Sequence, residues 1–235
     1  MTINDFIQET KKWGIELDNN ILEKLNEYYI FLTEYNMHTN LTRIIEKEDV
    51  YLKHFYDSIL VTKYFDFNNC SSLLDIGTGA GFPGVVLALL FPNIKVTLLD
   101  SNSKKTTFLE LLKEKLNINN IEIVHARAED YAKLNQEKYD VCISRSVAFL
   151  DIIVGLSMPF IKKDGIIILM KGILNDELKL LNNNFKQIGI KEYKINNYYL
   201  YNNEDERNII ILSKENNIPI LSYPQLLKRH SKLIK

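Results

Sequence analysis

One glycine-rich stretch constrains the fold of this chain more than any other feature of its sequence. The apolar run Leu73-Leu74 leads to Asp75-Ile76, four glycines follow within the eight residues 77–84, and residues 85–91 are again apolar. Glycine tolerates a positive φ and lets a ligand approach the backbone without meeting a Cβ. The pattern is typical of a buried parallel strand that turns sharply into a helix whose free N–H groups face a ligand.

Two classes of ligand use such a loop. Gly79, Gly81 and Gly84 have the spacing of the dinucleotide fingerprint, which is weak evidence by itself. The Asp75 carboxylate would repel a pyrophosphate and attract a ligand that carries an ammonium and a sulfonium. We therefore favour S-adenosylmethionine, while a dinucleotide and a loop without a ligand stay open. Asp100 ends the next predicted strand, where a carboxylate can bind the ribose hydroxyls of either ligand.

Composition indicates an ordinary globular protein with one sizeable domain and a small addition. The chain has 235 residues, of which 46% are hydrophobic and 25% charged, and its net charge is −1. No apolar run approaches the roughly 20 residues that span a membrane, and the N-terminus is polar, so we expect a cytoplasmic protein. The two cysteines, Cys70 and Cys142, are expected to be free buried thiols, and we expect no metal site.

The predicted elements divide the chain in two. Residues 1–68 form a helical extension, with helices at 5–13, from 18 or 19 onward, and at about 48–64. His54 and Asp57 lie one turn apart on the last helix and could pair with each other or cap locally. Residues 69–235 alternate between strands and helices and form the second unit. Its last eight residues carry four basic and no acidic side chains, typical of a solvated tail or a phosphate-binding one.

The second unit is predicted to be a doubly wound α/β domain, Rossmann-like, with a mostly parallel seven-stranded sheet. The apolar runs predict strands at 72–76, 95–99, 121–125, 139–144 and 166–170, with helices at 82–91, 103–116, 149–160 and 176–183. Two further β-rich runs, 190–200 and 208–213, flank a turn at 202–205 and predict an antiparallel hairpin. Ligands of such sheets bind beyond the carboxyl ends of the strands.

Two polar residues follow the third and fourth strands at this edge. Glu129 could read the amino edge of an adenine or could cap a short helix. Arg145 would lie at the mouth, beside a transferable methyl group, where an arginine can bind a phosphate or stack on a base; an ordinary surface arginine is the alternative. No residue is an obvious general base. Methylation of guanine N7 needs none, because this nitrogen carries a lone pair and no proton, so positioning would be the main catalytic contribution.

Several of these segments together resemble the glucose-inhibited division protein B family in order and spacing. They are 75–84, Leu99-Asp100-Ser101 with Lys104-Lys105, Arg127-Ala128-Glu129, 144–148 and 169–172, and upstream Tyr35-Asn36, Asn40-Leu41-Thr42, His54 and Asp57-Ser58. The resemblance covers most of the chain. The chain departs from the family pattern at Tyr35, Ser146 and Phe149, and at Tyr223-Pro224-Gln225 near the C-terminus.

Members of that family are bacterial methyltransferases that modify guanine N7 in 16S ribosomal RNA. The resemblance implies that this chain does the same, with 16S rRNA or the small ribosomal subunit as partner. It implies that S-adenosylmethionine is bound by Gly77, Phe82, Ala128, Glu129 and Arg145, with Arg145 near the target base; the loop chemistry adds Asp75, Gly79 and Asp100. We expect a monomer.

Two other functions stay open from the sequence. A nicotinamide-dependent oxidoreductase would use the same loop for a dinucleotide. A non-catalytic RNA-binding or ribosome assembly factor would keep the fold without affinity for a cofactor.

Overall fold

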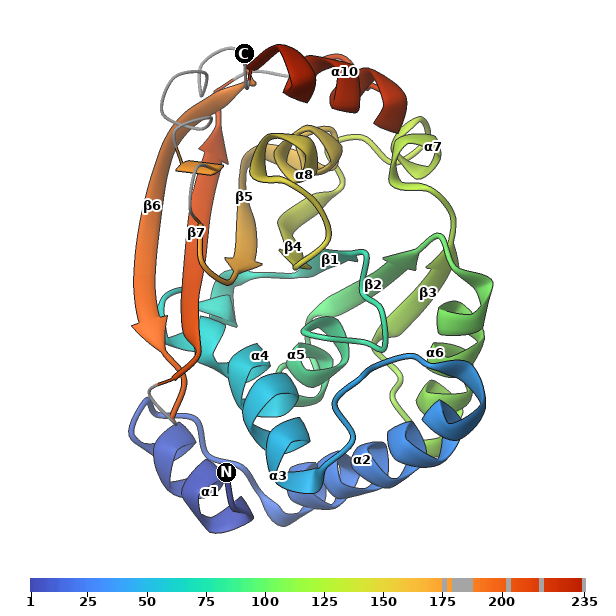
Figure 1. The fold of residues 1–235 in the computed structure, drawn as a ribbon, viewed down its shortest axis with the longest axis vertical. Coiled ribbons are helices and arrows are strands. Elements are labelled where there is room, and N and C mark those ends of the chain that lie inside the picture. The colour runs from blue at the N-terminus through green and yellow to red at the C-terminus, as the bar shows by residue number, and fades with distance from the viewer. Residues whose placement is uncertain (175–176, 179–187, 202–203, 216–217, 234–235) are drawn as a thin grey trace.

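The computed structural model describes residues 1–174, 177–178, 188–201, 204–215 and 218–233. Seven strands form one sheet in the order β3-β2-β1-β4-β5-β7-β6 (Figure 1). Strands β1 to β5 pair in parallel, and β7 pairs antiparallel with both β5 and β6. This arrangement confirms the predicted doubly wound α/β fold and its closing hairpin. The strands are β1 Ser72–Ile76, β2 Lys95–Asp100, β3 Ile121–His125, β4 Tyr139–Arg145, β5 Ile161–Lys171, β6 Ile190–Tyr199 and β7 Glu206–Lys214.

Helices cover both faces of the sheet. Successive strand residues point to opposite faces, so Leu73 belongs to one apolar cluster and Leu74 to the other. The face of Leu73 packs against the N-terminal helices together with α5 and α6, and the face of Leu74 packs against α7, α8 and α10. The helices are α1 Ile3–Lys11, α2 Asn19–Thr39, α3 Lys47–Val50, α4 Asp57–Leu60, α5 Gly84–Leu90, α6 Ser103–Lys115, α7 Ala128–Ala132, α8 Leu150–Ser157 and α10 Tyr223–Leu233.

The helix predicted over residues 48–64 is not a regular α-helix. A π-helical turn, η1 Tyr51–Tyr56, separates α3 from α4, and a 3₁₀ turn, η2 Val61–Lys63, follows α4. Most side chains of η1 are buried, so its wide turn is held by packing. A π-helical turn changes which backbone carbonyls are hydrogen-bonded within the helix. Here the Lys53 carbonyl accepts a hydrogen bond from Arg145 of β4.

Strand β5 is longer than its predicted span. It begins at Ile161, and its pairing with β4 shifts between the pairs Tyr139–Ile161 and Val141–Ile166. Residues 162–165 therefore form a bulge, and its residues Lys163-Asp164-Gly165 precede the strand 166–170 that the sequence predicted. Polar residues and a glycine look like a loop in sequence, but the apolar residues on both sides pair with β4.

The C-terminal segment is a helix, although the sequence suggested a tail. Helix α10 packs on α8, and the buried Leu226 lies so close to Gly155 that a Cβ there would approach it to 2.5 Å. Its His230 makes a 2.8 Å contact with Asp151. Of the helix predicted at 176–183, most residues lie outside those described, and so do residues 202–203 of the predicted hairpin turn.

Candidate active site

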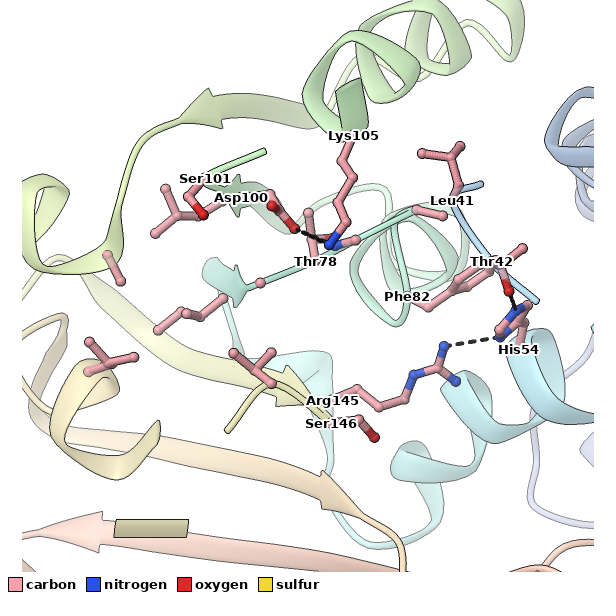
Figure 2. Close-up of a pocket in the computed structure, with 18 of the residues that line it drawn as sticks. Leu41, Thr42, His54, Thr78, Phe82, Asp100, Ser101, Lys105, Arg145 and Ser146 are labelled. Carbon is pink, nitrogen blue, oxygen red and sulfur yellow. Dashed lines mark hydrogen bonds and ion pairs between the residues drawn. The ribbon is translucent and has the colours of Figure 1, made fainter. Parts of the chain in front are cut away.

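A cavity of about 850 Å³ lies where strands β1 to β4 end. Ile76, Asp100, Ala126 and Arg145 line it from these four strands or the residues just after them. The N-terminal segment around Thr42 and His54 forms another wall (Figure 2). The volume is in the range of small-molecule sites, and the position is the one that an open parallel sheet favours for its ligand.

The glycine loop forms the floor of this cavity. Gly77 and Gly79 both have a positive φ, +69° and +63°. At Gly77 a Cβ would meet Val147 at 2.5 Å, so only glycine fits between β1 and the loop that follows β4. At Gly79 a Cβ would have no neighbour nearer than 4.0 Å, so its backbone is open to a ligand.

Asp75 lies beneath the loop and not on the cavity wall. Its side chain is fully buried, and Oδ2 accepts hydrogen bonds from the Thr78 hydroxyl at 2.7 Å and from the Gly84 N–H at 2.8 Å. Burial raises the pKa of this carboxyl group to about 6, although the two hydrogen bonds act in the opposite direction. Gly84 is the first residue of α5, so the carboxylate takes the helix N-terminus that a pyrophosphate would otherwise use.

Asp100 is on the cavity wall at the end of β2. Its Oδ2 accepts from the Gly79 N–H at 3.0 Å and pairs with Lys105 Nζ at 3.4 Å, and Oδ1 accepts from the Asn102 N–H at 2.9 Å. Figure 2 shows the pair that Asp100 forms with Lys105, and the three contacts together fix the carboxylate against the glycine loop. The structure thus brings together two residues that the sequence placed 21 positions apart.

Ala128 and Glu129 line the cavity at the end of β3. Glu129 lies in the first turn of α7, and no side-chain hydrogen bond caps that helix. Its Oε1 instead accepts from Arg127 Nε at 3.1 Å and from the Tyr223 N–H at 3.3 Å. The carboxylate therefore joins α7 to the first residue of α10.

Arg145 is fixed by the N-terminal extension. Its Nη1 donates to the Lys53 carbonyl at 2.8 Å and to Asp57 Oδ2 at 3.1 Å, and its Nη2 donates to His54 Nδ1 at 3.1 Å. The guanidinium also lies 5.3 Å from the centre of the Phe82 ring. His54 and Asp57 thus both bind the arginine, a partner that their spacing alone did not indicate. Asp57 also accepts from the Tyr198 hydroxyl, 3.1 Å away.

His54 is neutral and its tautomer is set by its neighbours. Burial and the charge of Arg145 lower its pKa to about 3. Since a guanidinium can only donate, Nδ1 accepts from Arg145, and Nε2 donates to Thr42 Oγ1 at 3.1 Å. The imidazole stacks on Phe82 with ring centres 4.3 Å apart, and Phe82 stacks on Tyr28 at 5.1 Å.

Several residues of the site were not predicted from the sequence. Thr42 holds His54, Tyr28 supports Phe82 and donates to the Ala80 carbonyl, and Tyr223 lines the cavity near Glu129. In the sequence, Thr42 stands out only as part of a segment that resembles the family, and Tyr223 only as part of a segment that departs from it. Their roles could not be predicted, because they depend on contacts between distant elements.

Within the described parts of the chain, no group of three or more His, Cys, Asp or Glu side chains could hold a metal ion. In the same residues, no helix is long and apolar enough to cross a membrane. Both cysteines are free and buried.

Comparison with known sequences identifies relatives along nearly the whole chain. A model of the family described as "rRNA small subunit methyltransferase G" matches residues 21–209. The protein named ribosomal RNA small subunit methyltransferase G from Mesoplasma florum is 51% identical over 70% of this chain and 72% of its own. Proteins of the same name from Bacillus licheniformis and Bacillus subtilis are 39% and 38% identical, over 93% and 96% of this chain and 93% and 95% of theirs.

Solved structures show the same fold. A predicted O-methyltransferase from Agrobacterium tumefaciens has a TM-score of 0.56 at 16% identity, over 68% of this chain and 81% of that one. An N-methyltransferase from Haemonchus contortus, solved with phosphomonomethylethanolamine and S-adenosylhomocysteine, has a TM-score of 0.57 at 13% identity, over 80% and 60%.

These relatives give no support to a nicotinamide-dependent oxidoreductase or to a non-catalytic factor. The family model spans the glycine loop, Asp100, Glu129 and Arg145, and it includes most of the N-terminal helices that hold Arg145. The chain belongs to the rRNA small subunit methyltransferase G family.

Proposed function

We propose that the protein transfers a methyl group from S-adenosylmethionine to N7 of a guanine in the 16S rRNA of the small ribosomal subunit. The single observation that carries the proposal is the cavity at the carboxyl ends of β1 to β4, floored by the glycine loop, in a chain of the rRNA small subunit methyltransferase G family. Because the proposed substrate is ribosomal, we also propose that the reaction takes place in the cytoplasm and that a monomer performs it.

The residues of the cavity fit this cofactor. The open backbone at Gly79 accepts a close approach, and the Asp100 carboxylate stands where ribose hydroxyls can donate to it. Asp75 contributes through the loop, because its carboxylate holds Thr78 and Gly84 and removes the helix N-terminus as a phosphate site. A sulfonium, which is cationic and carries no phosphate, suits such a site.

The bound sulfonium supplies an electrophilic methyl group with a good leaving group. The protein needs to place guanine N7 in line with it, and no proton has to be removed. Arg145 is suited to this positioning, because three acceptors fix two of its nitrogens and Nε has no hydrogen-bond partner among the described residues. We propose that Nε–H faces the ligand side of the cavity and contacts the cofactor or the target base.

The RNA must present the guanine outside a helix, since a base inside a duplex cannot reach this cavity. The net charge of −1 gives the protein little general affinity for phosphates, so its RNA contacts are local and salt-sensitive.

The test uses S-adenosylmethionine labelled in its methyl group and small subunits from cells that lack this modification. After incubation and digestion of the RNA, label in 7-methylguanosine is the expected result. Cofactor binding without labelled 7-methylguanosine would contradict the guanine assignment, and absence of cofactor binding would contradict the cofactor assignment. Arg145→Ala is the matched variant for comparison with wild type, because it removes the proposed positioning group and leaves the glycine loop intact.

A further inference from the structure

We propose that the C-terminal helix α10 completes the cofactor site, with the Tyr223 ring against the adenine and the Tyr223 N–H positioning Glu129 to read the adenine amino group. This inference rests on the proposed function and deepens it, because it adds to the same cavity Tyr223 and helix α10, neither of which the sequence indicated as part of the cofactor site.

Tyr223 stands on the cavity wall beside Ala128 and Glu129. It is half-buried, and the guanidinium of Arg127 lies 5.5 Å from its ring centre. The cavity wall after β3 is where an adenine is expected in this fold, and flat aromatic rings are good partners for nucleobases. The phenol ring is therefore well placed to contact the base.

The backbone of Tyr223 also orients Glu129. The carboxylate Oε1 accepts from both Arg127 Nε and the Tyr223 N–H. Oε2 has no hydrogen-bond partner among the described residues, and the side chain is only 12% exposed. A mostly buried acceptor without a donor at the adenine end of the cavity suits an exocyclic amino group, which adenine has and hypoxanthine lacks.

Helix α10 is held in place by contacts away from the cavity. His230 Nδ1 lies 2.8 Å from Asp151 Oδ1, and Arg229 Nη2 donates to the Asp151 carbonyl at 2.8 Å. Leu226 is fully buried against Gly155. These contacts join the middle and the last turn of α10 to α8 and fix the whole helix, so His230 is a positioning residue that acts on the ligand only through Tyr223.

The test compares binding of S-adenosylhomocysteine with that of its inosine analogue, in which a carbonyl replaces the amino group, by titration calorimetry on the full-length protein. The wild-type protein is expected to bind the adenosine compound at least about tenfold more tightly. Glu129→Gln should reduce this preference to about twofold. Tyr223→Ala should weaken binding of both compounds by about tenfold, because it removes the ring and keeps the N–H.

Two variants separate the helix position from a general loss of structure. His230→Gln should lower both the affinity and the preference, with an unchanged rate of transfer at saturating cofactor. Leu227→Ala, on the exposed side of α10 at 40% exposure, should change neither, and Tyr223→Phe should keep wild-type affinity. Melting temperatures identify variants that fail to fold.

Wild-type affinity in Tyr223→Ala, or an unchanged preference in both Glu129→Gln and His230→Gln, would overturn the inference. Failure of the wild-type protein itself to bind S-adenosylhomocysteine would overturn the proposed cofactor, and the inference with it. The two failures are thus distinguishable.

Discussion

Two arginines near the carboxyl ends of β3 and β4, two strands that β2 and β1 separate, have very different surroundings. Arg145, the last residue of β4, has a side chain that is 15% exposed, and buried groups from the N-terminal extension hold it. Arg127, after β3, is 54% exposed and contacts Glu129 and the ring of Tyr223. The inner end of the cavity is thus rigid and depends on the N-terminal helices, whereas the outer end is more solvated and depends on α10. Changes at the inner end should therefore have larger effects.

The largest effect is expected from Tyr28→Ala, which should destabilise the protein by about 3–5 kcal/mol. Tyr28 is fully buried, stacks on Phe82 and donates to the Ala80 carbonyl of the glycine loop. Urea unfolding measures the change. Tyr199→Ala, at 53% exposure, is the matched control and should cost well under half as much. Equal losses in the two variants would refute a rigid inner end.

Arg145→Ala should lower the rate of methyl transfer to small subunits by about 100-fold, because the substitution removes the group that positions the reactants. Asp57 keeps the Tyr198 hydroxyl and Arg207 as partners, so the fold should survive. Single-turnover transfer of labelled methyl measures the effect. Lys12→Ala, an exposed cation far from the cavity in sequence, is the control. A rate within twofold of wild type would make Arg145 an ordinary structural residue.

His54→Gln should change how stability depends on pH. The folded pKa of about 3 lies below the ordinary value of 6.5, so between these values the unfolded chain binds a proton that the folded chain does not. The stabilisation by neutral His54 is present above pH 6.5 and is lost as the pH falls toward 3, by up to about 1.4 kcal/mol per pH unit.

Urea unfolding of wild type and His54→Gln between pH 4 and 7 measures this contribution. Asp75, whose raised pKa has the opposite effect, is common to both proteins and cancels in the difference. Parallel stability curves for the two proteins would contradict a neutral buried His54.

The smallest effect is expected at the outer end. Arg127→Ala should weaken cofactor binding by about twofold to fivefold, because an exposed ion pair contributes little. Calorimetric titration with S-adenosylhomocysteine measures it. A loss as large as that of Tyr223→Ala would show that the outer end is organised by the guanidinium and not by α10.

The sequence was sufficient for the parts of the site that depend on local pattern. The glycine loop, Asp100, Glu129 and Arg145 each follow a predicted strand, and the sheet topology brings strand ends together. Apolar periodicity also located most strands within a residue or two, β5 excepted, whose bulge hides its first pairs.

Contacts between distant elements could not be predicted in this way. The π-helical turn depends on the packing of its aromatic residues, and the pairing of Arg145 with His54 and Asp57 joins residues about 90 positions apart. The sequence suggested a tail for the basic C-terminal residues, because among the residues of α10 only one leucine and one histidine are buried against the rest of the protein. Asp75 was expected to attract the ligand directly, but it lies beneath the glycine loop and binds Thr78 and Gly84. This position follows from the geometry of the loop, which the sequence does not reveal.

The contacts of Asp57 also determine when, during synthesis of the chain, the site can assemble. Its carboxylate is in place only when β4 and the β6–β7 hairpin have arrived, and Tyr198 follows it by 141 residues. At the usual speed of translation that interval is on the order of 10 s. The helix that carries Asp57 is therefore synthesised well before the strands that supply its partners. A chain that has not yet reached Tyr198 lacks one of the groups that hold Asp57, and Asp57 in turn holds Arg145.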